Sequence, residues 1–288
     1  LGSPTYLGAI ADRDTLLVNP ARLAWGLAEA AHSLGVQIFE GTPVLGLHDA
    51  GTRVLASTAD ASVTARQVAL ATNAFPSIVS SVGRYVVPVY DYALVTEPLT
   101  VSQWESIGWR QRQGFSDAGN QFHYYRPTAD GRILWGGYDA FYHPDMSVDQ
   151  ALVVDRAAFG RLAEHFLQTF PQLEGIGFTH GWGGAIDTCS RFSPFWGVEH
   201  GGKTVYVAGY TGLGVGASRF GAQVMLDLLA GRSTERTRLE MVRTKPMPFP
   251  PEPFRSMGIN WTTKSLQSAD HNSGRRNLWL RTLDRVGL

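Results

Sequence analysis

The chain has 288 residues, of which 44% are hydrophobic and 17% are charged. This balance is ordinary for a folded globular protein, and the length suits one large or two moderate domains at about 100–200 residues per domain. The 25 Lys and Arg residues equal the 25 Asp and Glu residues in number. A formal charge of zero gives no reason to expect a nucleic acid or an anionic membrane as a partner.

Cysteine and histidine usage narrows the class further. The single cysteine, Cys189, excludes an intramolecular disulfide and fits a reducing compartment. The eight histidines have no metal-ligand spacing, so we expect no metal site. The most apolar helical segment, residues 217–230, is interrupted by Arg219 and Asp227 and is too short to span a membrane. These features predict a cytoplasmic protein without a membrane partner.

The first 75 residues predict an α/β arrangement. Asn19-Pro20 opens a segment of helical period that continues to Ser33, with proline at the favoured first position of the helix. Runs of apolar residues then predict strands over residues 36–39, 44–47, 54–58 and 68–71, the middle two as a hairpin-like pair.

Residues 76–180 differ in character. Residues 85–95 and 122–126 are rich in Val and Tyr, as strands commonly are, and Asp130-Gly131 is a strong hairpin signal before a strand over residues 133–136. Apolar residues at helical spacing predict a helix over residues 148–170, which Pro171 ends. This block is predicted to be an antiparallel sheet with one or two helices.

A glycine-rich loop joins a predicted strand over residues 205–208 to a predicted helix. Gly209, Gly212, Gly214 and Gly216 fall in the loop, the helix follows from Ala217, and Gly231 is placed to cap it. Free backbone N–H groups at the positive end of a helix suit an electron-rich ligand atom such as a phosphate oxygen. The loop therefore predicts a site for a nucleotide-type cofactor.

The loop does not fit the first phosphate-binding turn of a Rossmann unit. That turn requires a second strand about 20 residues later, ending in Asp or Glu. After Gly231 the chain instead runs into five prolines between Pro246 and Pro253. The loop is therefore predicted to be the last unit of a nucleotide-binding domain, and a NAD-dependent dehydrogenase is disfavoured.

Several segments, in this order and spacing, resemble the FAD-dependent D-amino-acid-oxidase-like family of amine and amino-acid oxidoreductases. Glycine oxidase and gamma-glutamylputrescine oxidoreductase are the members that the sequence looks most like. Before the glycine loop, the segments that carry the resemblance are residues 19–23, 35–44, 68–74 (with Asn73 where glycine is usual), 96–99, 136–139 and 181–184.

The resemblance implies an α/β (α+β) fold, in which a partial FAD-binding Rossmann-like domain is interleaved with an antiparallel-sheet substrate domain. Residues 1–75 and 181–232 would form the FAD-binding domain, residues 76–180 the substrate domain, and residues 233–288 a C-terminal extension. The family begins with a G-x-G-x-x-G turn that holds the FAD pyrophosphate, and none precedes Asn19. We therefore expect a fragment or a truncated representative.

The resemblance also implies noncovalent FAD and oxidation of the C–N bond of an amine or amino acid by hydride transfer to flavin N5. It places Val44, Ala71, Thr72, Gly209, Tyr210, Thr211, Gly212, Leu213, Gly214 and Val215 at the cofactor. Cavity-lining catalytic candidates are Tyr92, Tyr125, Trp182 and Tyr210. Packing in the core or on a sheet face is the competing interpretation for about half of the aromatic residues, because strands are enriched in them anyway.

Some residue roles and the function itself stay open. Arg126 could anchor a substrate carboxylate or form a surface ion pair. Leu213 and Gly216 stand where the family often has histidine or can have a basic residue, and they favour an amine substrate over a small amino acid. The alternative to an enzyme is a non-catalytic remnant or interaction module that cannot hold FAD. Such a module would expose a sheet edge and would need a missing N-terminal segment or a partner chain.

Overall fold

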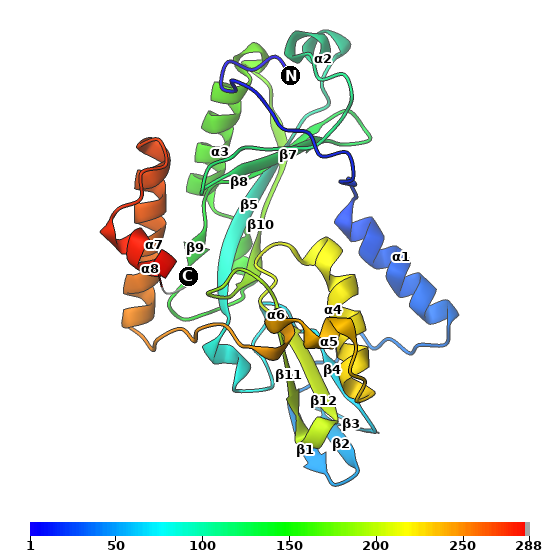
Figure 1. Cartoon of the computed structure of the whole chain (residues 1–288). Helices are drawn as coiled ribbons and strands as arrows, with labels where there is room; N and C mark the ends of the chain where they lie inside the picture. The colour runs from blue at the N-terminus through cyan, green and yellow to red at the C-terminus, as the bar shows by residue number, and fades with distance from the viewer. Residues whose placement is uncertain (286–288) are drawn as a thin grey trace. The chain divides into compact units, whose positions relative to one another are not determined.

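The computed structural model describes residues 1–285, which form two compact units (Figure 1). Unit 1 contains residues 1–17, residues 89–185 and the chain from Glu252 onward; unit 2 contains residues 18–88 and 186–251. Each unit is assembled from segments far apart in the sequence. Residues 1–17 and the C-terminal segment group with the middle block, whereas the sequence places residues 1–75 in one domain and treats residues 233–288 as an extension.

Unit 1 is built on the predicted antiparallel sheet. The strands run in the order β10-β5-β8-β7-β6, with β9 paired to β5. They span Val87–Thr96 (β5), Phe115–Ser116 (β6), His123–Pro127 (β7), Ile133–Gly137 (β8), Phe141–Tyr142 (β9) and Phe178–Thr188 (β10). The hairpin predicted at Asp130-Gly131 joins β7 to β8, and Gly131 adopts the left-handed φ of 81° that such a turn requires.

One face of this sheet packs against α3 (Arg156–Thr169). The helix is shorter than the sequence predicted, because Asp155 caps it by accepting hydrogen bonds from the N–H groups of Ala157 and Ala158 at 2.8 and 3.0 Å. Phe166 from α3 lies against Trp135 from β8, with the two ring centroids 5.5 Å apart, and both side chains are fully buried. This aromatic contact forms the centre of the core of unit 1.

Unit 1 also contains further α-helices. They are α2 (Val101–Ile107), α7 (Phe254–His271) and α8 (Leu278–Arg285). The sequence predicted α8 as residues 278–286, of which Val286 lies outside the described residues, but it did not predict α7. Asp270 of α7 accepts hydrogen bonds from the N–H groups of Asn120 and Gln121, both at 2.9 Å, which ties this helix to the loop before β7.

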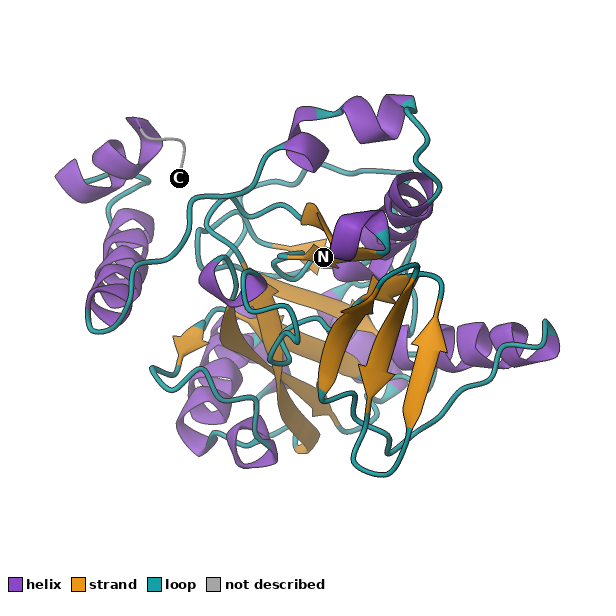
Figure 2. Ribbon diagram, turned by 90° about the horizontal axis from the view of Figure 1, so that it is seen from below, coloured by secondary structure: helices purple, strands orange, loops and turns teal. Residues whose placement is uncertain are grey.

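Unit 2 contains two small sheets and the glycine-loop helix (Figure 2). The hairpin predicted over residues 44–58 forms as β1 (Gly46–Ala50) and β2 (Arg53–Ser57), and β3 (Ser62–Ala65) extends it. The second sheet has the order β11-β12-β4, from Phe195–Glu199, Thr204–Ala208 and Val68–Leu70. Helix α4 (Gly214–Leu229) packs on β12, and the short helices α5 (Glu235–Arg238) and α6 (Glu240–Arg243) follow.

The segment before β1 follows the sequence prediction only in part. Helix α1 (Pro20–Ser33) forms with the predicted bounds, and Asn19 caps it by accepting a hydrogen bond from Arg22 N. The predicted strand over residues 36–39 is wrong: these residues form no strand, and Phe39 is 72% exposed. The physical reason is that no other strand of the described chain pairs with them, since apolar character alone does not make a strand without a hydrogen-bonded neighbour. In residues 1–285, no helix is both long and apolar enough to cross a membrane.

Replacing Phe166 with Ala should destabilise the protein by about 3–5 kcal/mol, because it removes a fully buried ring and leaves a cavity. The matched control is Phe254→Ala in the same unit, where the ring is 64% exposed and the expected change is within about 0.5 kcal/mol. Urea unfolding followed by circular dichroism measures both. Equal effects of the two substitutions would contradict the placement of this core.

Candidate functional site

The glycine loop of unit 2 reverses the chain sharply between β12 and α4. Gly209, Thr211 and Gly212 all have positive φ, at 81°, 51° and 84°. A Cβ atom on Gly209 would lie 2.9 Å from both Cβ and Sγ of Cys189, so this position has room for glycine only. At Thr211, which lacks that freedom, the side-chain oxygen donates to Gly209 O at 3.1 Å and accepts from Cys189 N at 3.3 Å. These contacts hold the loop in one conformation.

A buried carboxylate lies beneath the loop. Asp187 at the end of β10 is 2% exposed, and its Oδ2 accepts a hydrogen bond from Gly209 N at 2.7 Å. The N–H groups of Tyr210 and Thr211 also interact with Asp187. Burial raises the pKa of Asp187 despite these donors, which favour the ionised form. Because the N–H groups of residues 209–211 point to Asp187, a ligand would have to use other groups of the loop.

The N-terminus of α4 supplies such groups. Leu213 occupies the N-cap position but provides no side-chain hydrogen bond, and its own N–H donates to Tyr210 O at 3.0 Å. No side chain of residues 1–285 caps the first turn of the helix, which begins with Gly214-Val215-Gly216. The first N–H groups of a helix have no partner within it, and they carry the positive end of the helix dipole. This end of α4 therefore suits an electron-rich ligand atom.

Strand β4 brings two more predicted residues to the same sheet edge. β4 runs parallel to β12, with Val68 opposite Thr204 and Leu70 opposite Tyr206. Ala71 and Thr72 follow β4 just as Gly209 follows β12, so both segments leave the sheet at the carboxyl ends of parallel strands, where open α/β sheets bind ligands. Asn73, found where glycine is usual, adopts a φ of 50°, which asparagine tolerates better than most residues.

Two further predicted cofactor contacts are Val44 and Tyr210. Val44 is 39% exposed and lies in no strand, and its contact with a cofactor stays a prediction. The ring of Tyr210 turns onto α4, with its hydroxyl in the space left by the missing side chain of Gly221. Burial, together with the nearby Asp187, raises the pKa of Tyr210 to about 12. Packing on α4 explains Tyr210 without a substrate, and its cavity-lining role stays a prediction.

The other aromatic candidates lie in unit 1, on the two faces of its sheet. Tyr92 and Tyr125 are 2% and 3% exposed and belong to the core under α3. The hydroxyl of Tyr92 donates to Leu152 O at 2.9 Å. Trp182 of β10 is 41% exposed. Burial therefore indicates a packing role for Tyr92 and Tyr125, and of the candidates in unit 1 Trp182 alone has a substantially exposed side chain.

Asp91 and Tyr124 of the same sheet are further polar residues that the sequence did not predict as part of a site. The hydroxyl of Tyr124 donates to Asp91 Oδ2 at 2.8 Å. Two signals were available: an acidic residue in the middle of an otherwise uncharged strand, and a Tyr-Tyr pair on β7 of which only one ring can enter the core.

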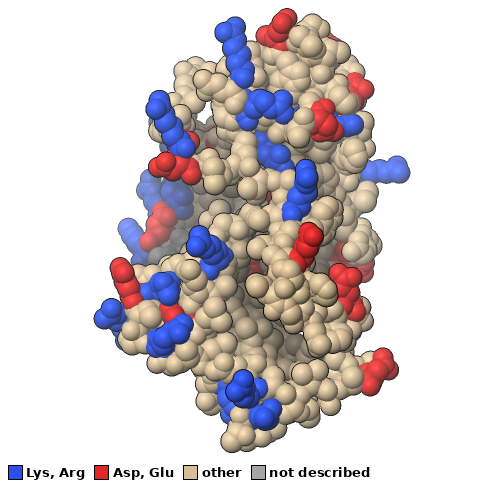
Figure 3. Space-filling view, turned by 90° about the vertical axis from the view of Figure 1, so that its right-hand side faces the viewer, with Lys and Arg blue, Asp and Glu red and all other residues tan. Residues whose placement is uncertain are grey.

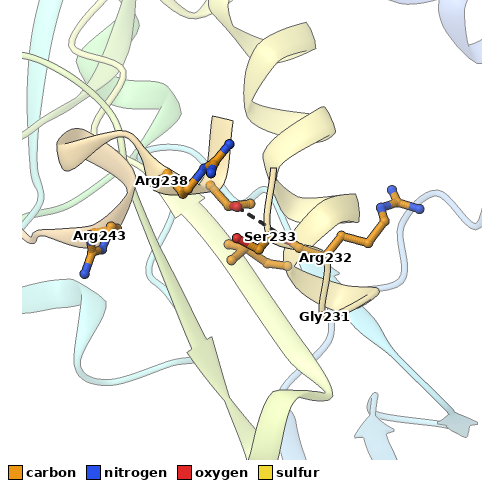
Figure 4. Close-up of a pocket in the computed structure, with 7 residues that line it drawn as sticks. Gly231, Arg232, Ser233, Arg238 and Arg243 are labelled. Atoms are coloured by element: carbon orange, nitrogen blue, oxygen red, sulfur yellow. Dashed lines mark hydrogen bonds between the residues drawn. The ribbon is translucent and has the colours of Figure 1, made fainter. Parts of the chain in front are cut away.

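A pocket lies elsewhere in unit 2 (Figure 4). It has a volume of about 430 Å³ and is lined by Leu228, Gly231, Arg232, Ser233, Thr237, Arg238 and Arg243. The lining residues come from the C-terminal end of α4 and from α5 and α6. The end of α4 lies about 20 Å from the glycine loop at 1.5 Å per helical residue. On the face of the molecule that Figure 3 shows, both positive and negative side chains are exposed.

Fold and site together define the class of protein. A parallel strand pair, a glycine turn and an uncapped helix N-terminus at one sheet edge are typical of a nucleotide-cofactor domain, here combined with an antiparallel sheet unit. The chain belongs to the family of FAD dependent oxidoreductases, whose family model matches residues 1–228.

Three relatives illustrate the match. The chain is 32% identical to the probable oxidoreductase OrdL of Haemophilus influenzae, over 80% of this chain and 51% of the relative. It is 28% identical to gamma-glutamylputrescine oxidoreductase of Escherichia coli, over 90% of this chain and 59% of the relative. The crystal structure of glycine oxidase from Geobacillus kaustophilus has the same fold, with a TM-score of 0.65 at 19% identity over 78% of this chain and 58% of that one. The chain thus spans between half and three fifths of these relatives.

Replacing Asp187 with Ala should destabilise the protein by about 1–3 kcal/mol, since the buried Gly209 N–H loses its acceptor. Asp187→Asn keeps an acceptor oxygen and should cost less. Urea unfolding is the measurement, with Asp60→Ala in an exposed turn of unit 2 as the control. Equal stability of Asp187→Ala and the unsubstituted protein would rule out the anchoring role.

The free energy of unfolding should also depend on pH differently in the unsubstituted protein and in Asp187→Asn. Because the folded-state pKa of Asp187 is raised, the folded protein binds the Asp187 proton more tightly than the unfolded chain does. The stability that this proton contributes is fully present below the unfolded pKa of about 4. It is lost as the pH rises through the folded pKa. The stability of the unsubstituted protein relative to Asp187→Asn should therefore decrease from about pH 4 toward neutrality. A difference that is constant with pH, or one that increases, would contradict the raised pKa.

Proposed function

We propose that this chain is part of a FAD-dependent oxidoreductase that oxidises the C–N bond of a small amine or amino acid. The uncapped N-terminus of α4, at the sheet edge where Ala71 and Thr72 also leave β4, is the observation that supports it most directly. Bound there, FAD would accept hydride at N5 from the substrate carbon that bears nitrogen. The relatives are named for gamma-glutamylputrescine and glycine, which are an amine derivative and an amino acid.

Each part of the loop has a distinct role in this proposal. Gly212, Leu213, Gly214 and Val215 would meet the cofactor, where the positive end of α4 stabilises negative charge. Asp187 holds the loop from below through Gly209. Cys189 is buried, and its Sγ lies 3.2 Å from Ser193 O and 3.4 Å from Gly209 O. Because this thiol is enclosed, we propose noncovalent FAD; a free thiol also fits a cytoplasmic location.

A second candidate function rests on the surface that unit 2 leaves uncovered. Helix α1 buries none of its 14 residues, and Trp25 and Leu27 are 71% and 62% exposed. Within residues 1–285, β4 pairs with β12 on one side only, as the last strand in the order β11-β12-β4. Exposed apolar groups and an open strand edge favour pairing with another polypeptide. We propose that the sequence is a fragment, and that a further segment or a partner chain covers this surface; without it, the chain would be an interaction module that does not hold FAD.

Purified protein mixed with FAD and passed through gel filtration should retain a protein-perturbed flavin absorption band. Gly214→Asp should bind FAD roughly tenfold more weakly, because a carboxylate at the N-terminus of α4 competes with the electron-rich ligand. The substitution fits the fold, since a Cβ atom at Gly214 would meet Tyr210 at an ordinary 3.6 Å. Gln223→Glu, exposed and farther along α4, is the charge-matched control. A colourless protein would leave the interaction-module alternative.

The uncovered surface predicts concentration-dependent self-association of the chain in sedimentation velocity. Replacing Trp25 and Leu27 with Glu should shift the protein toward the monomer, because the substitutions place charge on the exposed face of α1. Leu226→Glu on α4, where the side chain is 60% exposed, tests whether any added charge has this effect. A cooperative monomer at all concentrations before substitution would contradict the need for a covering segment.

A further inference from the structure

The two faces of the sheet in unit 1 differ in kind. Alternate residues of β5 (Tyr90, Tyr92 and Leu94) and Tyr125 of β7 belong to the core under α3. Alternation along a strand therefore places Asp91 and Tyr124 on the opposite face. On β10, Cβ atoms at Gly181 and Gly183 would meet Leu94 and Tyr92, so Trp182 between them also lies on this opposite face.

Asp91 is the central polar group of that face. Its Oδ1 accepts a hydrogen bond from Tyr92 N at 2.8 Å, its Oδ2 accepts from the Tyr124 hydroxyl at 2.8 Å, and Gly137 N–H also interacts with the carboxylate. The side chain is half-buried, and it forms no ion pair with any cation in residues 1–285. A carboxylate with three neutral donors and no cation keeps its charge uncompensated.

The sequence around Gly136 and Gly137 fits this arrangement. Tyr124 lies opposite Gly136 in the β7–β8 pairing, and Gly136 lies opposite Ala93 of β5. A Cβ atom on Gly136 would come within 2.7 Å of Cζ and Oη of Tyr124. The missing side chain therefore lets the phenol cross β8 and reach Asp91 on β5. A glycine at this position has a specific use, which is to bring a hydroxyl donor to a carboxylate two strands away.

Since Gly181 and Gly183 lie against Leu94 and Tyr92, Gly184 lies beside Asp91 on the opposite face, and this position has free room. A side chain at Gly184 on β10 would meet no atom within 4 Å. The charged and titratable groups near Asp91 do not neutralise it: Asp139 repels it and pairs with Arg161 at 2.7 Å. Arg126, two residues from Tyr124 on the same face of β7, has a hydrogen bond to Pro127 O at 3.5 Å. The face thus offers a carboxylate, an exposed indole at Trp182 and free space, which together suit an alkylammonium group.

We propose that Asp91, oriented by Tyr124, binds a cationic ammonium group of the amine substrate. That the bound amine is a substrate rests on the proposed function. The ammonium site narrows the substrates of that function to amines that carry an alkylammonium group. The carboxylate supplies a charge-assisted hydrogen bond, and Trp182 supplies an aromatic face beside the alkyl chain. Tyr124 is a positioning residue, because its hydroxyl contacts Asp91 and not the ammonium group.

Isothermal titration of the FAD-free chain with 1,4-diaminobutane tests the inference without any activity measurement. The unsubstituted protein should bind the diamine and not 1,4-butanediol, its neutral analogue. Asp91→Asn, nearly identical in shape, should weaken diamine binding by roughly tenfold to a hundredfold, as expected for a lost charged partner. Tyr124→Phe keeps the carboxylate and should weaken binding by about tenfold or less. Asp130→Asn, in the exposed β7–β8 turn, should leave binding unchanged.

The pH profile separates recognition of charge from a structural role. Burial raises the pKa of Asp91, so protonation removes the carboxylate charge at a higher pH than for an ordinary Asp. Diamine binding should therefore weaken as the pH falls through that raised pKa, and Asp91→Asn should lack this dependence. Equal diamine affinity in Asp91→Asn and the unsubstituted protein, or equal binding of the diol, would overturn the inference.

The same experiments distinguish the failure of this inference from that of the proposed function. A protein that binds the diamine through Asp91 but retains no FAD would contradict the oxidoreductase and leave the ammonium site standing. A protein that retains FAD but whose diamine affinity is insensitive to Asp91 would contradict the ammonium site alone. Circular dichroism of each variant confirms that the fold is intact before its affinity is compared.

Discussion

In unit 2, the carboxylate of Asp187 accepts a hydrogen bond from Gly209 N–H at 2.7 Å, and this buried contact sets the path of the chain from β12 into α4. Three residues with positive φ lie in or next to the turn it holds. Since Asp187 occupies the N–H groups of residues 209–211, the free donors are those of the first turn of α4. The position of the candidate cofactor site along the loop thus follows from one carboxylate underneath it.

The sequence predicted a helix or turn correctly where the residues that begin or end it lie within that segment itself. Asn19-Pro20 predicted the start of α1, Asp130-Gly131 predicted the β7–β8 turn, and Gly231 ends α4 with a left-handed φ of 63°. The loop between β12 and α4 was predicted in the same way. What the loop sequence could not supply was the direction of its N–H groups, because their acceptor, Asp187, lies 22 residues earlier in the chain.

Tertiary partners decide the features that the sequence prediction missed. Residues 36–39 have the composition of a strand but no neighbour to pair with, so they remain irregular. Helix α7 begins directly after a run of prolines, which predicted irregular structure. Its Asp270 nevertheless anchors the helix on the loop before β7. The Tyr-Tyr pair on β7 shows the same limit: alternation requires one ring on each face, but only the position of α3 decides that Tyr125 enters the core and Tyr124 does not.

Three enclosed or half-enclosed carboxylates show how partners separate structural from ligand-binding roles. Asp227 is held by Arg232 and Arg236, which lower its pKa and leave no charge to neutralise. Asp187 has only backbone donors, and these belong to a loop whose path it determines. Asp91 also lacks a cation among the described residues, but it lies beside Gly184, where an added Cβ atom would meet no atom within 4 Å. A protein keeps such an uncompensated charge at a cost in folding free energy, and binding a cation is the role that accounts for that cost at Asp91.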